Sequence, residues 1–411
     1  MKLIARERIF FQSPSPTEIF CSTPFLCRGF EQRMIASFDL AGPGVAHLVG
    51  EKSDTGDFNA SNQARIYTSD DHGSSWRERT RLPMLHSRVF RAGKRLYCLG
   101  HSGRLLIAAS SDNGTTWGPA KLLDDRFSYH QSGCTIDRCH GRIYLVMECA
   151  EGRNTWPDVA LILMSADEQA DLTRWENWRQ SDRLHFDGIA SCPQPFGMPF
   201  YPLGNQTPGH PDVRFNGAPG FLETNVLRIY DPHHTFYDPE DRTVVLISRL
   251  HSGTTNMAVF LRGREDADGS LHIDTFTTPG GAPFLYVPLP GGHMKFQIIY
   301  DDRSRYYWLA STQSTDSMTK PEFLEEKRYN LPNNERRRLA LYYSRNLVDW
   351  CWAGMVTVGE NERTARHYAS LLIDGDDLYL LSRSGDTRAV CAHNGNLVTL
   401  HRVKQFRRLI N

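Results

Sequence analysis

The sequence predicts an all-β protein folded as a single β-propeller, and three observations indicate this fold. A motif of the form S-x-D-x-G-x-x-W occurs at 69–76 and again 41 residues later at 110–117. Extended apolar runs recur in pairs joined by short turns along the chain, which is typical of antiparallel strands. No convincing amphipathic helix occurs beyond short pieces near 166–178 and 320–328. A strand unit that repeats about every 40 residues is typical of propeller blades.

The repeated motif is expected to form a compact turn between two strands. Serine and aspartate side chains bond nearby backbone N–H groups, glycine supplies the positive φ, and tryptophan packs beneath the turn. The carboxylate is therefore expected to stabilise its own turn and to take no part in catalysis. Looser copies follow Ser165 and Ser344. The two full copies consist of Ser69, Asp71, Gly73, Trp76, Ser110, Asp112, Gly114 and Trp117.

The remaining strand pairs set the number of blades. Runs such as RVFRAGKRLYCLG (88–100), KFQIIYDDRSRYYWLAS (295–311) and YASLLIDGDDLYLLSR (368–383) each consist of an extended piece, a turn and a second extended piece. Counting such pairs gives six blades. The irregular stretch at about 180–222 is rich in proline and glycine, and a seventh blade could lie there. Because strands flank it on both sides, we expect it to be a functional loop within one domain that spans 1–411.

The composition excludes several classes of function. The 47 basic and 47 acidic residues give a formal net charge of zero, so nothing indicates a nucleic-acid or membrane partner. The nine cysteines include no CxxC pair, and several lie in apolar runs, so we interpret them as buried free thiols. No secretory leader or membrane span is evident. These features favour the cytoplasm and leave a secreted mature form open.

The motif copies resemble the Asp-boxes of the sialidase superfamily of β-propellers. Four further segments resemble the branch of that superfamily that contains ulvan lyases, rhamnose–glucuronate lyases and related α-L-rhamnosidases. They are FLETN (221–225), PGGHMKFQIIYD (290–301), RHYASLLIDGDDLYLLSR (366–383) and AHNGNLVTLHRVKQFR (392–407). The likeness extends from about residue 60 to the end. It implies seven blades, and we therefore prefer seven over the counted six.

True sialidases are a poorer match. They carry an arginine in an early R-I-P motif, the first of three arginines that hold the sialate carboxylate. The corresponding stretch STPFLCRG (22–29) contains Pro24 without that arginine. Sialidases also need an early aspartic acid and a Tyr–Glu nucleophile pair, and the sequence alone does not locate them.

The resemblance implies that the Asp-box turns lie at one end of the propeller. Polar residues at the ends of strands should then converge at the opposite end, although each also has a structural interpretation as a local hydrogen-bonding or ion-pairing group. Clustered histidine and arginine suit the binding of an anionic oligosaccharide or polysaccharide. The residues expected to bind substrate there are Glu148, Glu223, Asn225, Arg249, His251, His293, Lys295, Arg337, Arg366, Tyr368, Arg383 and His393.

The first expected function is a polysaccharide lyase that cleaves a glycan containing uronic acid and rhamnose by β-elimination. Cations neutralise the uronate carboxylate, a base removes the C5 proton, and an acid assists departure of the C4 oxygen. His101, His130 and Tyr201 are the candidates for proton transfer. Arg214 completes the catalytic set implied by the resemblance to ulvan-type lyases.

Two other functions stay open. An α-L-rhamnosidase or a sialidase-like exo-glycosidase would need two carboxyl groups across the scissile bond, and Glu148 and Glu223 are the candidates. The third function is a non-enzymatic propeller that binds glycans or proteins. A structural or site metal is also open: zinc would suit histidines such as His101 and His130 with His251 and His293, whereas calcium would need oxygen ligands.

Overall fold

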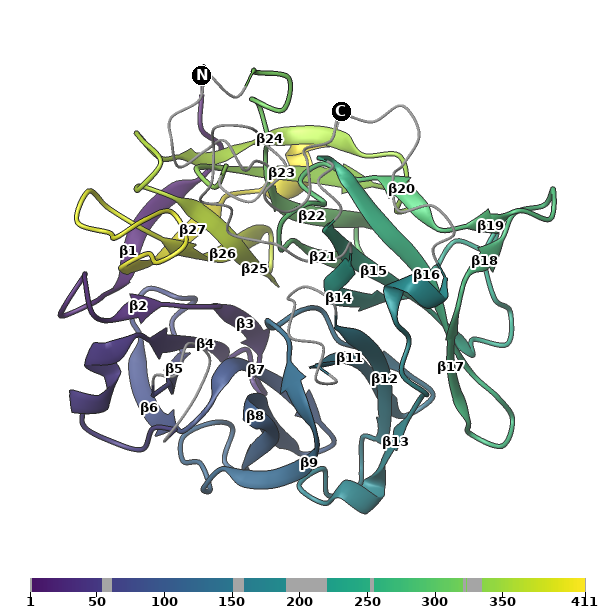
Figure 1. The fold of residues 1–411 in the computed structure, drawn as a ribbon, viewed down its shortest axis with the longest axis horizontal. Coiled ribbons are helices and arrows are strands. Elements are labelled where there is room, and N and C mark those ends of the chain that lie inside the picture. Colours follow the sequence, from purple (N-terminus) through teal and green to yellow (C-terminus); the bar gives the residue numbers. More distant parts are fainter. Residues whose placement is uncertain are drawn as a thin grey trace.

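The computed structural model describes residues 2–53, 61–150, 159–189, 220–251, 255–320, 323 and 335–410. Within these ranges the regular structure consists of β-strands and short 3-10 turns, and small sheets surround a central axis (Figure 1). No helix in the described part of the chain is long and apolar enough to cross a membrane. The prediction of an all-β fold is confirmed.

The first half of the described chain forms three successive antiparallel units. Their strands are listed here by unit. Blade 1 contains β2 (Phe20–Cys21), β3 (Phe25–Arg28), β4 (Met34–Ala41), β5 (Gln63–Ser69) and β6 (Arg77–Leu82); blade 2 contains β7 (Leu85–Ala92), β8 (Arg95–Ser110) and β9 (Lys121–His130); blade 3 contains β10 (Asp137–Cys139), β11 (Arg142–Ala150), β12 (Ala160–Asp167) and β13 (Trp178–Gln180). Strand β8 is long enough to act as both the second and the third strand of its blade, and β9 pairs with β11, so blades 2 and 3 share one sheet.

The second half forms three more units. Blade 4 contains β14 (Gly220–Leu227), β15 (Thr243–His251), β16 (Met257–Glu265) and β17 (Leu271–Asp274), with β20 (Tyr286–Pro288) added to β16; blade 5 contains β21 (Gln297–Asp301), β22 (Tyr306–Thr312), β23 (Arg338–Ser344) and β24 (Cys351–Val358); blade 6 contains β25 (Arg366–Asp374), β26 (Asp377–Ser384), β27 (Leu397–Val403) and β1 (Arg6–Gln12). The short strands β18 (Phe276–Thr277) and β19 (Pro283–Phe284) pair with each other. The 3-10 turns are Pro43–His47, Trp175–Asn177, Phe186–Gly188 and Phe406–Leu409.

The ring closes where the first strand joins the last blade. Strand β1 pairs antiparallel with β27, and Figure 1 shows the purple strand beside the yellow one. Arg366 of β25 forms an ion pair with Glu7 of β1 at 2.8 Å, and Thr357 donates a hydrogen bond to the same carboxylate at 2.8 Å. Segments some 350 positions apart in sequence therefore fasten blades 5 and 6 to the start of the chain.

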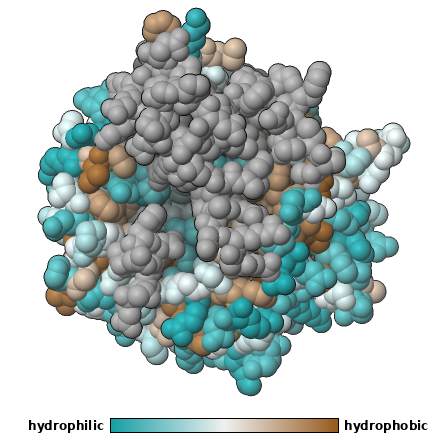
Figure 2. Space-filling view, viewed as in Figure 1, coloured by the Kyte–Doolittle hydropathy of each residue, from teal (hydrophilic) through white to brown (hydrophobic). Residues whose placement is uncertain are grey.

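Six apolar cores hold the blades together. In the described residues each core joins two neighbouring blades, and the series runs from blades 1 and 2 round to blades 6 and 1. Strands between two such cores are buried along their length, as in β4 and β14. The visible rim is mostly hydrophilic with scattered apolar patches (Figure 2). The large apolar side chains are thus mainly gathered between blades.

The described strands account for six blades, the number obtained by counting strand pairs. The preference for seven came from the resemblance, and the described residues do not supply a seventh. The stretch at 180–222, where a further blade was considered, includes residues 190–219, which lie outside the described ranges. The arrangement as a propeller is confirmed.

The S-x-D-x-G-x-x-W motifs form the turns that the sequence predicts. Each connects the third strand of its blade to the fourth. Asp71 accepts hydrogen bonds from the backbone N–H of Ser75 at 2.8 Å and from the Ser69 hydroxyl at 2.7 Å, and Gly73 has a φ of 73°. Asp112 makes the equivalent bonds to Thr116 and Ser110. The hydrogen bond from the Ser75 hydroxyl, followed by those from the Ser75 backbone and the Ser69 hydroxyl, lowers the pKa of Asp71 to about 2.

The weaker copy after Ser344 keeps the same turn with other residues. Asn346 accepts backbone hydrogen bonds from Val348 at 3.1 Å and from Asp349 at 2.9 Å. Leu347 adopts a φ of 65° without the advantage of a glycine. The end of the propeller that carries these turns and the turns between first and second strands is called the Asp-box face below, and the opposite end is called the mouth face.

Replacing Asp71 should weaken the fold and leave any chemistry at the mouth face unchanged. The Asp71→Ala variant loses the acceptor for Ser69 and Ser75, and we expect unfolding to become easier by roughly 1–2 kcal/mol. Thermal unfolding measures the change, and Glu176→Ala, at an exposed position in the same connection of blade 3, is the control. A folded Asp71→Ala protein that has lost turnover would contradict the assignment of the two faces.

Candidate functional site

Three inner strands carry the same local distortion. The pairing register shifts in β7 after Leu85, in β14 after Leu222 and in β25 after His367. At each shift a residue other than glycine has a positive φ, which is 56° for His86, 59° for Glu223 and 55° for Tyr368. Such conformations cost about 1–3 kcal/mol each and gather at functional sites. Bulges also redirect side chains out of the strand ladder. The three strands belong to alternate blades 2, 4 and 6.

Polar side chains of neighbouring strands form hydrogen bonds that fix the bulges in β7 and β14. Asp39 of β4 accepts hydrogen bonds from the hydroxyl and backbone N–H of Ser87 at 2.6 and 3.1 Å. The hydroxyls of Ser248 and Thr224 lie 2.5 Å apart. Because Ser87 and Thr224 directly follow the strained residues, each contact fixes the direction of the side chain before it.

Tyr368 lies at the centre of a buried charged group that we name the tyrosine–cation cluster. Nη1 of Arg249 donates to Oε2 of Glu223 at 3.0 Å and to Oη of Tyr368 at 3.1 Å. Three more cations surround the ring of Tyr368 at 5.7–5.9 Å from its centroid. All members are at most 6% exposed. The cluster consists of Glu223, Arg249, Lys295, Arg336, Tyr368 and Arg383.

The cations keep Glu223 ionised. Burial alone would raise the pKa of Glu223, but Arg249, Lys295 and a hydrogen bond with Tyr368 lower it below its ordinary value. Burial likewise works against Lys295 and lowers the pKa of its ammonium group. Glu223 therefore carries a negative charge within hydrogen-bonding reach of a phenol.

Three histidines and a glutamate form a second group, the histidine cluster. Nδ1 of His86 and Nε2 of His101 lie 2.9 Å apart, and the ring of His130 lies 4.9 Å from that of His86. Nδ1 of His130 contacts Oε2 of Glu148 at 3.0 Å. His130 is 19% exposed, whereas Glu148 is fully buried behind it. This arrangement can carry a proton between the mouth and a buried carboxyl group.

The two clusters meet at one hydrogen bond. Oε1 of Glu148 accepts from the backbone N–H of Glu223, the residue with the strained backbone. Burial raises the pKa of Glu148, although His130 acts in the opposite direction. The pKa values of two neighbouring carboxyl groups are thus shifted in opposite directions, which is the pattern that separates an acid from a base.

Two buried side chains, Arg383 within the tyrosine–cation cluster and His293 beside it, have nitrogen atoms without a partner among the described residues. Among the described residues, both ring nitrogens of His293 and Nε of Arg383 have no hydrogen-bond partner, and both side chains are at most 5% exposed. His293 lies next to Arg249, whose Nε donates to its carbonyl oxygen at 2.8 Å. An unpaired buried polar group costs about 1–3 kcal/mol. A ligand with several oxygen atoms would satisfy these groups.

A hollow of about 530 Å³ lies beside the histidine cluster on the mouth face. It is lined by Arg104, Arg126 and Arg183 with one acidic residue, Asp125. It extends along β9 and β11, where Ser128 pairs with Ala150 two positions beyond the pair formed by His130 and Glu148. The hollow therefore places arginine side chains next to the site, of which Arg126 is paired with Asp124 at 2.7 Å.

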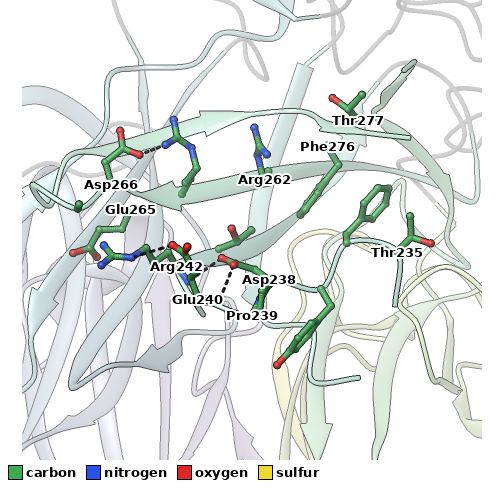
Figure 3. Close-up of a pocket in the computed structure, with 15 residues that line it drawn as sticks. Thr235, Asp238, Pro239, Glu240, Arg242, Arg262, Glu265, Asp266, Phe276 and Thr277 are labelled. Atoms are coloured by element: carbon green, nitrogen blue, oxygen red, sulfur yellow. Dashed lines mark hydrogen bonds and ion pairs between the residues drawn. The ribbon is translucent and has the colours of Figure 1, made fainter. Parts of the chain in front are cut away.

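A second hollow of about 550 Å³ lies on the Asp-box face of blade 4 (Figure 3). Its acidic and basic side chains pair with each other: Arg242 with Glu240 at 3.7 Å and Arg264 with Asp266. Because four acidic side chains and three basic ones line it, this hollow presents no positive field to an anionic sugar.

Most of the residues expected at the mouth face lie in these two clusters or touch them. His393 contacts Arg383 at 3.4 Å, and His251 is buried near Arg249. The residues so grouped are His101, His130, Glu148, Glu223, Arg249, His251, His293, Lys295, Tyr368, Arg383 and His393. Asn225 instead braces the backbone: it accepts from Thr135 at 3.1 Å and donates to the carbonyl of Phe296 at 3.2 Å. Tyr201 and Arg214 lie outside the described residues.

Two expected arginines are placed elsewhere. Arg337 lies 3.7 Å from Glu362, and the preceding residue Arg336 faces Tyr368 instead. Successive residues of an extended chain point to opposite sides, so a shift of one position changes the role completely. Arg366 is engaged by Glu7 and so serves ring closure. Both guanidinium groups are thus engaged by carboxylates, and their binding of substrate stays a prediction.

Sequence reasoning missed His86, Asp39 and Arg336. His86 lies in LHSR (85–88) at the same place in its strand as Glu223 in LETN (222–225). The sequence signal that could have located His86 was a polar residue directly after the first leucine of an inner strand. Among the described residues, the mouth histidines do not form a group of three metal ligands with ligand atoms within 4.8 Å of one another. The one such group in the described residues lies on the Asp-box face.

Comparisons with known proteins identify the fold. No protein-family model and no curated protein matches the chain. A sialidase from Trypanosoma rangeli superposes with a TM-score of 0.59 at 12% identity, over 100% of this chain and 61% of its own. An α-L-arabinanase from Penicillium chrysogenum superposes with a TM-score of 0.51 at 13% identity, over 98% of both chains. The chain has the sialidase-like β-propeller fold. It spans less than two thirds of the length of the trypanosomal sialidase.

The sialidase-like fold of this chain contains a buried acid whose ionisation opposes folding. Burial raises the pKa of Asp39 to about 7, although hydrogen bonds from Ser87 act against the shift. Between pH 4 and 7 the folded state holds a proton that the unfolded chain releases, so this group lowers stability as the pH rises. Asn at position 39 keeps an acceptor for Ser87 and cannot ionise.

We therefore expect Asp39→Asn to gain stability relative to the unsubstituted protein as the pH rises from 4 to 7, by up to about 4 kcal/mol. Urea unfolding at pH 4.5, 6 and 8 measures this difference. Asp71→Asn is the control, because the pKa of Asp71 is lowered to about 2 and its effect should change only below pH 4. Parallel stability curves for Asp39→Asn and the parent would contradict the prediction.

Proposed function

We propose that the protein is a glycoside hydrolase that cleaves a glycan next to a sugar carrying a carboxylate. The observation that carries this proposal is the bond of Arg249 to both Glu223 and Tyr368 among further buried cations. It supplies a tyrosine, a carboxylate and an anion-binding field within one group. This choice places hydrolysis ahead of the elimination that the sequence favoured.

The cations of the cluster support an acidic substrate. Lys295 is fully buried, and its one described hydrogen bond, to the carbonyl of Ala369, is long at 3.4 Å. Within the part of the chain that the structure describes, Nε of Arg383 and the two ring nitrogens of His293 have no hydrogen-bond partner. Buried cations are costly unless they are paired. A sugar carboxylate beside Lys295 and Arg383 would pair them and take up the free donors.

In the proposed reaction Oη of Tyr368 attacks the anomeric carbon. Its proton passes to Glu223, and Arg249 with the neighbouring cations stabilises the negative charge that develops on the phenol oxygen. The bond from the anomeric carbon to the leaving oxygen breaks, and that oxygen takes a proton. Water then displaces the tyrosine and restores the enzyme.

The histidine cluster would supply the proton for the leaving group. His130 reaches the mouth, and Glu148 behind it holds the imidazole in one orientation through the 3.0 Å contact. A histidine backed by a buried carboxyl group is a common general acid. His86 and His101, which contact each other through ring nitrogens 2.9 Å apart, lie beside the ring of His130.

The superposed sialidase structures support this proposal through the sugar they bind and through the residues that sialidases need. One structure of the Trypanosoma rangeli sialidase contains sialic acid, a sugar with a carboxylate. The Tyr–Glu pair that sialidases need is matched in kind by Tyr368 and Glu223. This chain departs from them at STPFLCRG (22–29), where their first arginine is missing, and we propose that Arg383 and Lys295 take over its task.

Elimination from a uronate remains the second candidate, favoured by the histidine cluster. Three histidines, of which the ring of His130 is partly exposed, suit proton abstraction beside a neutralised carboxylate. A propeller that binds acidic glycans without turnover is the third, and it would use the same cations. Rhamnose in the substrate is an expectation from the sequence resemblance only.

Replacing Tyr368 by Phe should abolish hydrolysis while the fold is retained. We expect kcat to fall at least about 10³-fold, because the nucleophile is lost. The panel of substrates contains sialyl and glucuronyl oligosaccharides, ulvan and rhamnogalacturonan oligosaccharides, assayed for reducing ends and for the absorbance of unsaturated uronates. The control is Tyr379→Phe, which removes a phenol that donates to the carbonyl of His72 at 2.8 Å on the Asp-box face.

Each outcome separates the three functions. Reducing ends without the unsaturated absorbance support hydrolysis, and the absorbance of unsaturated uronates would establish the lyase in its place. Binding without any product in the unsubstituted protein would leave the glycan-binding propeller. Full activity in folded Tyr368→Phe would exclude a tyrosine nucleophile.

The hollow beside His130 should bind further acidic residues of a longer substrate. Arg104 is exposed, so Arg104→Ala should leave the fold intact and raise KM for acidic oligosaccharides roughly tenfold, with little effect on a single-residue substrate. Arg242→Ala, in the hollow of Figure 3 on the opposite face, is the matched control. Equal KM values for both variants and all substrate lengths would contradict this role.

A further inference from the structure

A second cluster of chemically reactive side chains lies on the Asp-box face, away from both clusters of the mouth. We propose that Cys139, His140 and Asp241 form a binding site for a divalent transition metal of the zinc type between blades 3 and 4. One ligand atom of each residue lies within 4.8 Å of the other two. The site is independent of the proposed glycan chemistry.

Two tight turns bring the three residues together. Cys139 ends β10, and His140 (φ 48°) with Gly141 (φ 70°) forms the turn into β11. Asp241 (φ 59°) lies in the turn between β14 and β15 of the next blade. Both non-glycine turn residues adopt the left-handed conformation, a costly backbone state that the surrounding structure holds in place.

The distances suit a small metal ion. Sγ of Cys139 lies 3.2 Å from Oδ2 of Asp241, and Nε2 of His140 lies 3.6 Å from the same oxygen. Ligands bonded at 2.0–2.3 Å in a tetrahedron are separated by about 3.3–3.8 Å. The observed spacing therefore allows one ion to reach all three atoms with small side-chain movements.

The donor set selects the type of metal. A thiolate, an imidazole and a carboxylate are the usual ligands of zinc, whereas calcium and magnesium prefer oxygen atoms alone. Three protein ligands leave a fourth position for water. Cys139 is buried and His140 is exposed, so the ion would have one protected side and one route of entry.

A neighbouring arginine fixes the carboxylate. Arg228 forms an ion pair with Oδ1 of Asp241 and also donates to the carbonyl of Arg138 at 3.2 Å. The pair turns Oδ2 toward Cys139 and His140. Groups that orient a ligand in this way commonly accompany protein metal sites.

The consequence of metal binding would be a cross-link between two blades. Cys139 and Asp241 are 102 positions apart in sequence, and the intervening chain contains residues 190–219, which lie outside the described ranges. A link across a long stretch of chain removes more conformational entropy from the unfolded state than a link across a short one. The metal should therefore stabilise the boundary of blades 3 and 4.

Titration of the untagged, metal-stripped protein with Co²⁺ tests the proposal. We expect one equivalent to give the near-ultraviolet charge-transfer absorption of a Co²⁺–thiolate bond, and Zn²⁺ to displace it. Cys139→Ser should lose the absorption and bind Zn²⁺ at least about 100-fold more weakly. Cys351→Ser, which removes an exposed free cysteine elsewhere, is the matched control and should keep the absorption.

Thermal unfolding provides a second measurement. Zn²⁺ should raise the Tm of the unsubstituted protein and of Cys351→Ser, and should leave the Tm of Cys139→Ser unchanged. Absence of the thiolate absorption in the unsubstituted protein, or its persistence in Cys139→Ser, would overturn the proposal. Because neither measurement uses turnover, failure here is distinguishable from failure of the proposed hydrolase.

Discussion

The ion pair of Arg249 and Glu223 is the interaction on which the candidate site depends. Arg249 is fully buried and also contacts Tyr368 of blade 6 and the carbonyl of His293 ahead of blade 5. Removing one partner of a buried pair leaves an uncompensated charge, at a cost of about 3–5 kcal/mol. One guanidinium group therefore fixes the positions of three blades and the state of Glu223. The function we propose uses the same contacts that hold the centre of the ring together.

The backbone strain at the centre of the ring is tolerated because contacts elsewhere in the propeller stabilise the fold. His86, Glu223 and Tyr368 each occupy a costly backbone conformation, and together they oppose folding by several kcal/mol. Apolar cores between every pair of neighbouring blades, and the junction of β1 with β27, act at a distance from these residues. Because the cores constrain both ends of each inner strand, the bulges cannot relax without separating blades. Rigidity of the ring is thus what keeps the site in shape.

The sequence predicted those features of the structure that depend on local residue patterns. The turn at Asp71 follows from hydrogen bonds within a few residues, and the ends of strands located Arg249 and Tyr368 at one face. It could not predict contacts set by register or by distant pairing. Arg336 and Arg337 differ by one position, yet one faces Tyr368 and the other Glu362. Arg366 pairs with a residue 359 positions away, and the bulge at His86 leaves no periodic signal. The described strands supply six blades, and the expectation of a seventh concerns residues 190–219 outside the described ranges.

The link from Glu148 to the backbone of Glu223 makes the two clusters interdependent. The pKa of Glu148 is raised by burial, whereas burial acts against Glu223 and the adjacent cations prevail and lower its pKa. An anionic ligand beside Lys295 and Arg383 would weaken the field that keeps Glu223 ionised and so raise its affinity for a proton. Glu223 would then accept the proton of Tyr368 more readily once substrate is bound. The charge of the substrate would in this way raise the proton affinity of Glu223. An acidic sugar would then be favoured over a neutral one in the reaction as well as in binding.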